Sequence, residues 1–179
     1  MSKPLSELFD GTKGAIAFRG DAEAIIASRV DGMDLRAHPV AQKQLNARTR
    51  RMIAKRIRAR TATREEYERY MWDKRFRRRR RAGVKEYWKQ ERKRLESGEQ
   101  GTRNWSREQR LSILAGGAAR FKGRTLHAHH TYSARIYPQL ANRGEVIYPA
   151  TQREHLTGWH GGAYRNSLPG KRIRRIQDF

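Results

Sequence analysis

The amino-acid sequence predicts an α+β protein in which a mainly helical, basic N-terminal part precedes a small unit of two strands and a helix. Residues 41–97 contain one glycine and no proline, so little in them interrupts a helical pattern. From Phe121 onward, short apolar runs separated by turn residues are typical of strands. A chain of 179 residues can hold one compact domain with an extension, or two small units.

Charged residues are distributed unevenly along the chain. Residues 1–40 have 5 basic and 6 acidic side chains, whereas residues 41–179 have 36 basic and 12 acidic side chains, a net charge of +24. We therefore expect residues 1–40 to be a leader or docking segment with a role of its own. Residues 41–104 are then a basic helical region, and residues 105–179 form the α+β unit.

The N-terminal part is expected to contain several helices. Asp21 is a suitable N-cap and Gly32 a suitable stop for a short first helix. In the basic region, Thr63 and Glu66 form a capping-box pattern that opens a helix, and a further helical stretch follows Gly83. An earlier helix in the same region has a thin apolar stripe of Leu45, Met52, Ile53 and Ile57.

The α+β unit is expected to begin with a helix, followed by strand, loop, strand and helix. Residues 106–117 start with a capping pattern and end with two glycines, as a short helix does. Residues 125–130 and 146–148 have the composition of short strands. Thr151 is a suitable N-cap for a last helix that contains two histidines.

The large positive charge indicates a polyanionic partner. The formal net charge is +23 and the pI is about 11.4. Such a surface favours phosphate-rich partners, because each neutralised phosphate releases condensed counterions. An anionic membrane surface would favour an amphipathic helix with a clean apolar face, which the basic runs lack. One run is a candidate nucleic-acid contact, with a solvated helix face as the alternative: Arg77, Arg78, Arg79, Arg80 and Arg81.

Composition excludes several other classes of protein. The chain has no cysteine, so it can form neither a disulfide framework nor a thiolate zinc site. No apolar run approaches the length of a membrane span, and no signal-peptide core follows Met1. We therefore expect a soluble protein without membrane insertion and without a Sec signal peptide.

Histidines are concentrated in the α+β unit. Five of the six lie between residues 127 and 160, namely His127, His129, His130, His155 and His160. Imidazole is both a common metal ligand and a base near neutral pH. Neighbouring strand residues point to opposite sides, so the doublet favours one metal ligand and one base. We expect His127, like His38, to have a structural role.

These residues carry a family resemblance. The histidine doublet, the loop through Pro138, residues 144–147 and residues 151–161 resemble the HNH, or His-Me finger, nucleases. The similarity is greatest to the DNase domains of bacterial toxins, such as nuclease colicins and the C-termini of polymorphic toxins. Ala128-His129-His130 is the kind of signature after which toxin subgroups of this superfamily are named. The resemblance covers about residues 110–170 and does not cover residues 1–100.

The resemblance implies a ββα-metal finger, so that residues 105–179 are a nuclease domain. It implies that His129, His155 and His160 hold one divalent metal ion, with Mg²⁺, Zn²⁺, Ni²⁺ and Mn²⁺ all open. It also implies that His130 is the general base. Independently of the family, hydrolysis of a phosphodiester needs charge stabilisation at the phosphate and a base for water, which one metal and one imidazole supply.

Two features depart from the family pattern. His155 and His160 are five positions apart, rather than the four that place two side chains on one face of an α-helix. Gly158 lies between them and could let the helix distort. The middle Asn of the HNH name is also missing, because Val146 stands at its position, and Asn142 in the preceding loop is a candidate for the same bracing role.

Other polar residues near the finger are secondary candidates. Glu154 could orient a metal ligand, with a salt bridge on the helix as the alternative. Trp159 is expected in the core, and residues 164–166 could reach a DNA backbone. Four cations are candidates for contact with the scissile phosphate: Arg143, Arg153, Arg165 and Lys171.

The sequence thus favours a metal-dependent DNA endonuclease with little sequence specificity, which acts as an antibacterial toxin. Such a protein would be found in the cytoplasm of the producing bacterium, where an acidic immunity protein neutralises it, and a secretion system could deliver it into a target cell. RNA remains an alternative substrate. A phage or mobile-element HNH nuclease with a preferred site is one rival interpretation, and a non-catalytic nucleic-acid-binding protein with a structural metal is another.

Overall fold

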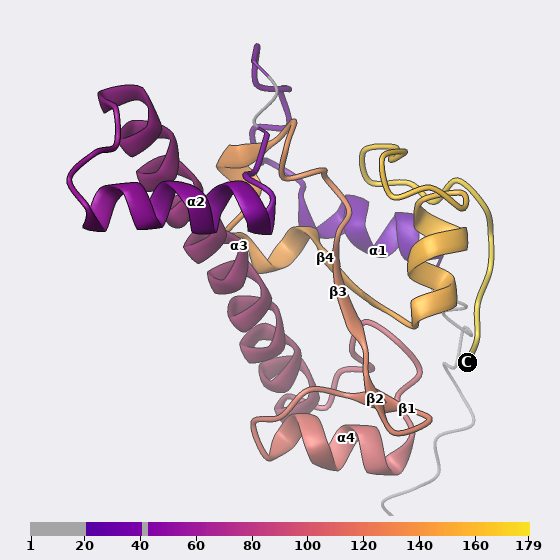
Figure 1. Cartoon of the computed structure of the whole chain (residues 1–179). Coiled ribbons are helices and arrows are strands. Elements are labelled where there is room, and N and C mark those ends of the chain that lie inside the picture. Colours follow the sequence, from indigo (N-terminus) through magenta and orange to yellow (C-terminus); the bar gives the residue numbers. More distant parts are fainter. Residues whose placement is uncertain (1–20, 41–42) are drawn as a thin grey trace, which may run out of the picture.

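The computed structural model describes residues 21–40 and 43–179 and confirms the α+β class. Helices surround two small antiparallel pairs of strands (Figure 1). The helices are α1 (Ala22–Arg29), α2 (Ala47–Arg58), α3 (Arg64–Glu96) and α4 (Arg107–Leu114), and the strands are β1 (Arg120–Phe121), β2 (Arg124–Thr125), β3 (His127–His130) and β4 (Ile147–Ala150). Short helical turns cover Pro138–Leu140, Gly144–Val146 and Glu154–Trp159.

Helix α3 is the longest element. The Thr63 and Glu66 capping box is present at its start, as predicted. The helix then continues for 33 residues, about 50 Å, through Gly83, where the sequence had indicated a separate stretch. Gly83 has a packing role instead, because a Cβ atom there would lie 2.6 Å from the carbonyl oxygen of Ala141.

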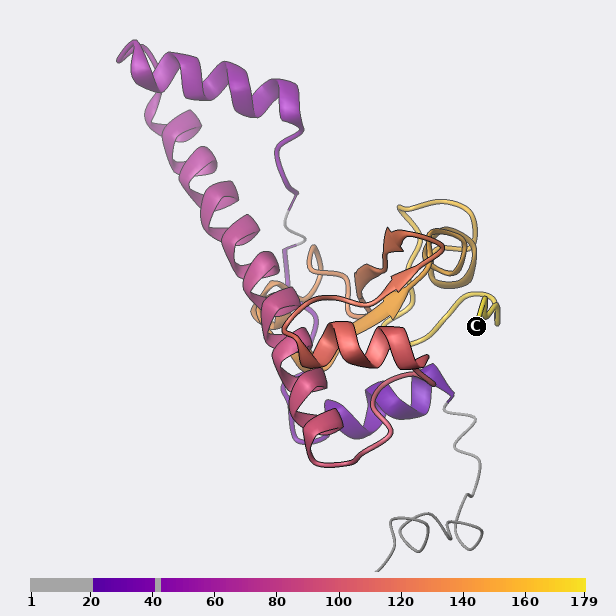
Figure 2. The ribbon, with the colours of Figure 1, turned by 90° about the horizontal axis from the view of Figure 1, so that it is seen from below.

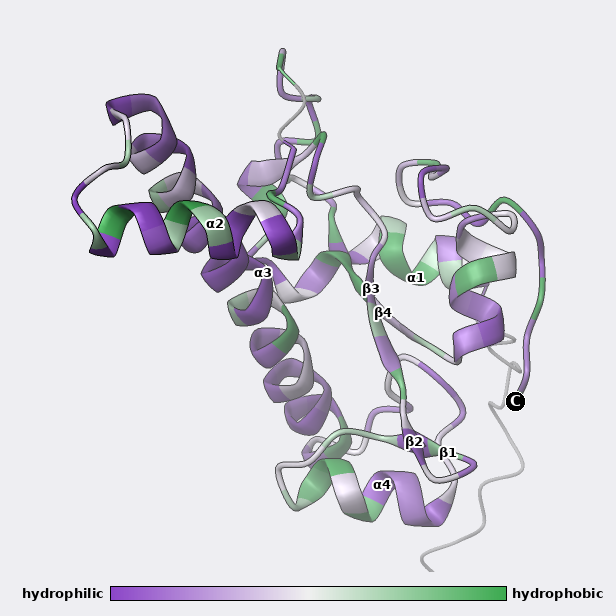
Figure 3. Cartoon of the chain, in the orientation of Figure 1, coloured by the Kyte–Doolittle hydropathy of each residue, from purple (hydrophilic) through white to green (hydrophobic). Residues whose placement is uncertain are grey.

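Helix α2 and the first half of α3 form a helical hairpin that extends away from the strands (Figure 2). Figure 3 shows that hydrophilic residues dominate α3. The segment before α2 is fixed by the Leu45 amide, which donates to the buried Asp73 carboxylate at 2.9 Å. The hairpin therefore carries most of its basic side chains on solvated surfaces.

Strands β3 and β4 form the centre of the finger. They pair antiparallel, with His127 opposite Ala150 and His130 opposite Ile147. Val146, which was expected in the second strand, belongs instead to the 3-10 turn before it. The finger then continues through a helical turn that ends at Trp159. This order of strand, loop, strand and helix is the predicted one.

Helix α1 corrects the interpretation of residues 1–40 as a separate leader. Its apolar side chains are buried against the finger, in a core cluster of Ala22, Ile26, Val30, Leu140, Val146, Tyr148, Ala150 and Trp159. Burial of a side chain such as Ile26 stabilises a fold by about 1.5–3 kcal/mol, so residues 21–30 are part of the domain. Residues 1–20, the remainder of the proposed leader, lie outside the described part of the chain.

The expected boundary at residue 104 is also absent from the packing. Leu95 at the end of α3 shares a core cluster with Trp105, Ile113 of α4 and Leu126 beside β3. A second link is the buried Glu91 carboxylate, which accepts hydrogen bonds from the Trp105 indole at 2.6 Å and from the Thr102 amide. The basic helical region and the finger therefore pack as one body. Within the described residues, no helix combines the length and apolarity that a membrane span requires.

Candidate metal centre and its histidine base

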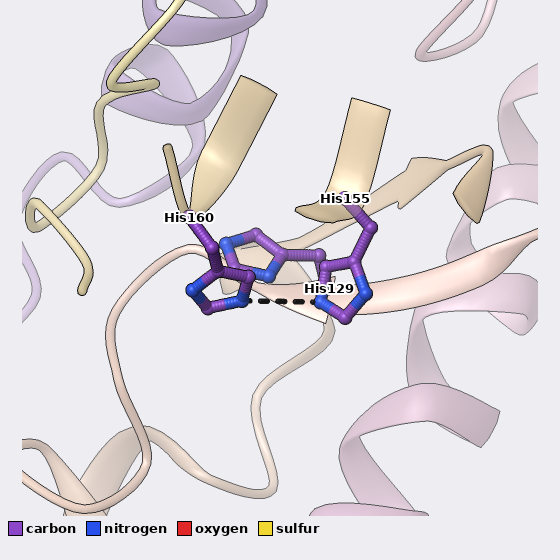
Figure 4. Close-up of side chains that lie close together, drawn as sticks. All are labelled: His129, His155 and His160. Carbon is purple, nitrogen blue, oxygen red and sulfur yellow. Dashed lines mark hydrogen bonds between the residues drawn. The ribbon is translucent and has the colours of Figure 1, made fainter. Parts of the chain in front are cut away.

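Three histidines converge on one point beside the end of the hairpin. His129 comes from β3, and His155 and His160 come from the turn Glu154–Trp159 and its end (Figure 4). The ring centroids are 4.9 Å apart for His129 and His155, 4.9 Å for His129 and His160, and 4.8 Å for His155 and His160. One nitrogen from each ring lies within 4.8 Å of the others, so a single metal ion could bind all three.

The unusual spacing of His155 and His160 is explained by the backbone. Glu154–Trp159 is a π-helix, in which each amide bonds to the carbonyl five residues earlier. The His160 amide donates to the His155 carbonyl at 3.2 Å. The five-residue offset therefore places both rings on one face, and the departure seen in the sequence is compensated.

Gly158 marks the place where the helix changes. Its carbonyl oxygen accepts hydrogen bonds from the Ile173 and Arg174 amides, both at 2.9 Å. A Cβ atom at Gly158 would contact the Arg174 carbonyl oxygen at 3.4 Å. The C-terminal segment thus pairs with a carbonyl in the last turn of the helix, which has no partner within the helix, at the glycine where the sequence had indicated a distortion.

The backbone also orients the ring of His160. Its Nδ1 lies 2.6 Å from the Asn166 carbonyl oxygen, which can only accept, so Nδ1 is the donor. The neutral ring therefore has its lone pair on Nε2, which lies 3.3 Å from Nε2 of His155. A hydrogen bond to the distal nitrogen commonly fixes a metal-binding tautomer. Residues 164–166, expected to contact DNA, act here through a backbone carbonyl.

The histidine cluster favours neutral rings. Burial, followed by the charges that His155 and His160 would carry, holds the pKa of His129 well below its usual range. Burial, followed by the neighbouring His160, lowers the pKa of His155 to about 4. Metal ions bind the unprotonated ring, so these environments prepare the ligands for a cation.

His130 lines the same cavity but makes a different contact. Its Nε2 donates to the Ala141 carbonyl oxygen at 3.0 Å, which leaves Nδ1 unprotonated in the neutral ring. Nδ1 is buried and has no hydrogen-bond partner among the described residues. Burial, followed by the nearby Arg80, lowers the pKa of His130 to about 4. All four histidines of the doublet and the π-helix face a cavity of about 480 Å³.

The Ala141 carbonyl is held in place by helix α3. The loop approaches α3 at Gly83, where there is no side chain to prevent contact. Arg79 of α3 donates to Asn142 Oδ1 at 2.8 Å and to the Gln139 carbonyl at 3.1 Å. Asn142 therefore has a contact of the bracing kind proposed for it, and the helix positions the acceptor of His130.

Of the four cations proposed to contact the scissile phosphate, only one lies at the histidine cavity. Arg165 lines the histidine cavity. Arg143 pairs with Glu145, Arg153 pairs with Asp178, and neither they nor Lys171 lines the cavity. The sequence reasoning missed Lys43 and Arg135, which do line it together with Arg80. Lys43 is far from the histidine motif in sequence, so no local signal indicated it. Arg135 follows the histidine doublet closely, and this proximity could have indicated it.

Glu154 does not orient a metal ligand. Its carboxylate is buried and forms a two-point ion pair with Arg103, with both N–O distances 2.7 Å. It also accepts from the amides of Thr151 and Asp178, each at 2.8 Å. Glu154 therefore forms a salt bridge, as the alternative predicted, but its partner is the buried Arg103, 51 positions away, and not a residue of the same helix. Trp159 is 1% exposed and lies in the core, as expected.

The five-arginine run does not act as a block. Arg77, Arg80 and Arg81 line a second cavity beside His130, whereas Arg79 braces the loop. Arg78 is exposed and lines neither cavity. Outside the metal cluster, the His127 ring lies 5.1 Å from the His155 ring, and exposed His38 contacts Val40 in its own loop.

The fold and the site together form a ββα arrangement with three potential metal ligands and a fourth histidine that lines the same cavity. Comparison with known families agrees with this class. Residues 65–151 match the family described as GHH signature containing HNH/Endo VII superfamily nuclease toxin. The predicted resemblance to toxin nucleases of the HNH type is thereby confirmed.

The matched region is informative in its extent. It begins in α3, which lies outside the resemblance expected from the sequence, and it includes the Ala128-His129-His130 triplet. It ends at Thr151, so His155 and His160 are assigned by the geometry of the structure alone. Comparisons with curated proteins and with solved structures gave no match.

Proposed function

We propose that the protein is a metal-dependent DNA endonuclease with little sequence specificity and that it acts as an antibacterial toxin. The observation that carries this proposal is the shared cavity, which His130 lines together with the three-imidazole cluster, while its buried Nδ1 has no hydrogen-bond partner among the described residues. The family match to nuclease toxins supports the hydrolytic class and the toxin role.

The donor set fits one divalent metal ion. Three neutral imidazoles suit Zn²⁺, Ni²⁺ or Mn²⁺, whereas hydrolysis by nucleases often uses Mg²⁺. A metal ion bound by His129, His155 and His160 would polarise the phosphate and stabilise the leaving 3′ oxygen. The proposal therefore assigns these residues as ligands and leaves open which metal is used.

The remaining chemistry belongs to side chains of the cavity. His130 accepts the proton of the attacking water at Nδ1, while its Nε2 stays fixed on the Ala141 carbonyl. Arg80 and Arg165 line the same cavity and bind phosphate oxygens. Cleavage leaves 5′-phosphate and 3′-hydroxyl ends, as the resemblance implies.

Low specificity is proposed because the arginines contact phosphates, which carry no base information. A net charge of +24 on residues 41–179 gives affinity for any duplex. The same charge would attract an acidic immunity protein in the producing cell, and a toxin would then need delivery into its target cell.

Digestion of plasmid DNA tests the proposal. Purified protein is incubated with EDTA, and each candidate metal is then restored separately. We expect no cleavage with EDTA, cleavage with at least one metal, and scattered ends when the products of limited digestion are sequenced. A defined site would support the mobile-element interpretation, whereas binding without cleavage in every metal would support a non-catalytic protein. Parallel digestion of RNA decides between the substrates.

A further inference from the structure

A second cavity borders His130. It has a volume of about 430 Å³ and is formed between the helical hairpin and β3. Four arginines line it, with Arg50 from α2 and Arg77, Arg80 and Arg81 from α3. The three on α3 are spaced i, i+3 and i+4, which places them on one face of the helix. We call this cavity the arginine pocket.

The arginine pocket is not neutralised by carboxylates. None of its lining residues is acidic. Among the described residues, none of the four guanidinium groups forms an ion pair. Arginines elsewhere in the chain do pair with carboxylates, for example Arg29, Arg56, Arg103 and Arg172. The nearest buried carboxylate on the helix, Asp73, is directed to the Leu45 amide instead. Four like charges in one cavity repel one another, so an anion bound among them would be stabilised.

Arg80 has a buried donor that no described residue satisfies. Its guanidinium is held by Gln44, whose Oε1 accepts from Nη1 at 3.0 Å. Its Nε is buried and has no hydrogen-bond partner among the described residues. Burial lowers the pKa of this guanidinium, although arginine remains charged. A buried donor without a partner is unfavourable, and an anion that accepted its hydrogen bond would remove this penalty.

The arginine pocket and the metal cavity are direct neighbours. Gln44, Arg80, Ala128 and His130 line both of them. An anion in the arginine pocket would therefore be separated from a phosphate at the histidine cluster only by the residues that the two cavities share. Consecutive phosphates of a nucleic-acid strand are likewise neighbours, so one strand could place a phosphate in each cavity.

We infer that the arginine pocket binds the phosphate next to the scissile one, so that the substrate is a strand with at least two consecutive phosphodiesters. This inference rests on the proposed nuclease function, because it concerns the substrate of the same site. Arg80 lies between the two phosphates, and Arg50, Arg77 and Arg81 hold the flanking one. The site then selects polynucleotides over isolated phosphodiesters.

The test compares two substrates and two variants. Bis(p-nitrophenyl) phosphate has one phosphodiester, whereas a tetranucleotide has a flanking phosphate. The variant Arg77→Gln/Arg81→Gln removes two charges from the arginine pocket. The matched control Arg75→Gln/Lys85→Gln removes two charges from exposed positions of the same helix that line neither cavity.

We expect the pocket variant to lower kcat/KM for the tetranucleotide at least tenfold, as the loss of hydrogen bonds to a charged group implies. Hydrolysis of bis(p-nitrophenyl) phosphate should stay unchanged, and the control should resemble the parent with both substrates. Equal losses with both substrates, or equal losses in pocket variant and control, would overturn the inference. The single variant Arg81→Gln, at an exposed position, repeats the test if the double variant does not fold.

Binding in EDTA separates this inference from the nuclease proposal. The tetranucleotide can bind without metal, so its affinity reports on the arginine pocket even if no metal supports cleavage. The slope of log K against log salt should decrease by about one in the pocket variant, as expected for the loss of one phosphate contact. An unchanged slope with parental affinity would exclude the flanking subsite, whereas absence of cleavage with normal binding would refute only the nuclease proposal.

Discussion

At the scale of single residues, His130 is distinguished from the other histidines by its hydrogen bond. Its Nε2 is committed to the Ala141 carbonyl, and its Nδ1 is free to take a proton. We expect His130→Ala to lower plasmid cleavage by about 10²–10⁴-fold, as the loss of a general base does. Metal content, measured on the same preparation, should remain that of the parent. Cleavage near the parental rate would show that another group is the base.

The three ligand histidines should respond differently. Replacement of His129, His155 or His160 by Ala is expected to weaken metal binding in calorimetry, because each ring supplies one of three converging nitrogens. His127→Ala is the matched control, since its ring lies beside His155 but outside the cluster. If His160→Ala bound metal as tightly as the parent, the π-helical geometry would not serve a metal site.

The histidine site illustrates what a sequence can and cannot predict for single residues. The doublet and the later pair identified the four histidines, because strand and helix periodicity are local properties. The partners of Glu154 and the neighbours of His130 were not predictable, because Arg103 and Arg80 come from distant parts of the chain. Such contacts depend on how the elements pack, which no local pattern encodes.

At the scale of elements, α3 supports the loop that carries the Ala141 carbonyl. Gly83 allows the Ala141 carbonyl to approach the helix, and a Cβ atom would lie 2.6 Å from it. In an ordinary helix, Gly→Ala is favourable by about 1 kcal/mol. We expect Gly83→Ala to destabilise the protein instead, by about 1–3 kcal/mol as in overpacked cores, and to reduce cleavage. Thermal unfolding measures the first effect.

The control for this prediction is the neighbouring Ala82, which is exposed. Ala82→Gly should cost about 1 kcal/mol through helix propensity alone and should leave cleavage intact. A stabilised Gly83→Ala variant with normal activity would mean that the loop is not held by α3. From the sequence, Gly83 was interpreted as a boundary between two helical stretches, because the close approach of a loop 58 residues away leaves no local pattern.

Helix α1 offers a further test at this scale, because it is joined to the C-terminal segment by ion pairs. Glu23 accepts hydrogen bonds from Arg172 at 3.1 Å. Burial alone would raise the pKa of Glu23, but the hydrogen bonds and charge of Arg172 outweigh it and lower the pKa to about 2. This lowered pKa contributes stability at neutral pH that is lost as the pH falls from about 4.5 toward 2.

The variant Glu23→Gln should therefore be less stable than the parent at pH 7, and this difference should disappear at low pH. Urea unfolding at several pH values measures it. Asp34→Asn is a suitable control, since Asp34 is paired with Arg36 on the exposed surface of its own loop. Equal stability of Glu23→Gln and the parent at pH 7 would indicate that α1 is not anchored to the finger through Arg172.

At the scale of the whole molecule, the positive charge of the protein would attract both the proposed substrate, at the arginine pocket, and the proposed acidic inhibitor. The distribution of charge was readable from the sequence, since it needs only a count of residues. The division into three units was not, because core clusters join α1, α3 and the finger across both expected boundaries. Apolar side chains are too sparse in each segment to form separate cores, and they are buried only when the segments combine.

This single basic body leads to the last prediction, which concerns the producing cell. If the protein is a toxin, an acidic immunity protein should bind it rapidly, because steered association can reach on the order of 10⁸–10⁹ M⁻¹s⁻¹ at low salt. Such a partner would cover the helical hairpin and the arginine pocket. The complex should then still bind metal through the histidine cluster but should fail to bind DNA.

Expression in a bacterium tests the toxin role directly. The active chain alone should stop growth, while the His130→Ala chain should be tolerated at the same level of protein, because it keeps the charge and the fold but loses the base. An acidic partner should rescue growth with the active chain. Equal tolerance of both chains, with the active protein present and folded, would mean that the nuclease does not harm the cell. This result would favour the mobile-element interpretation over the toxin.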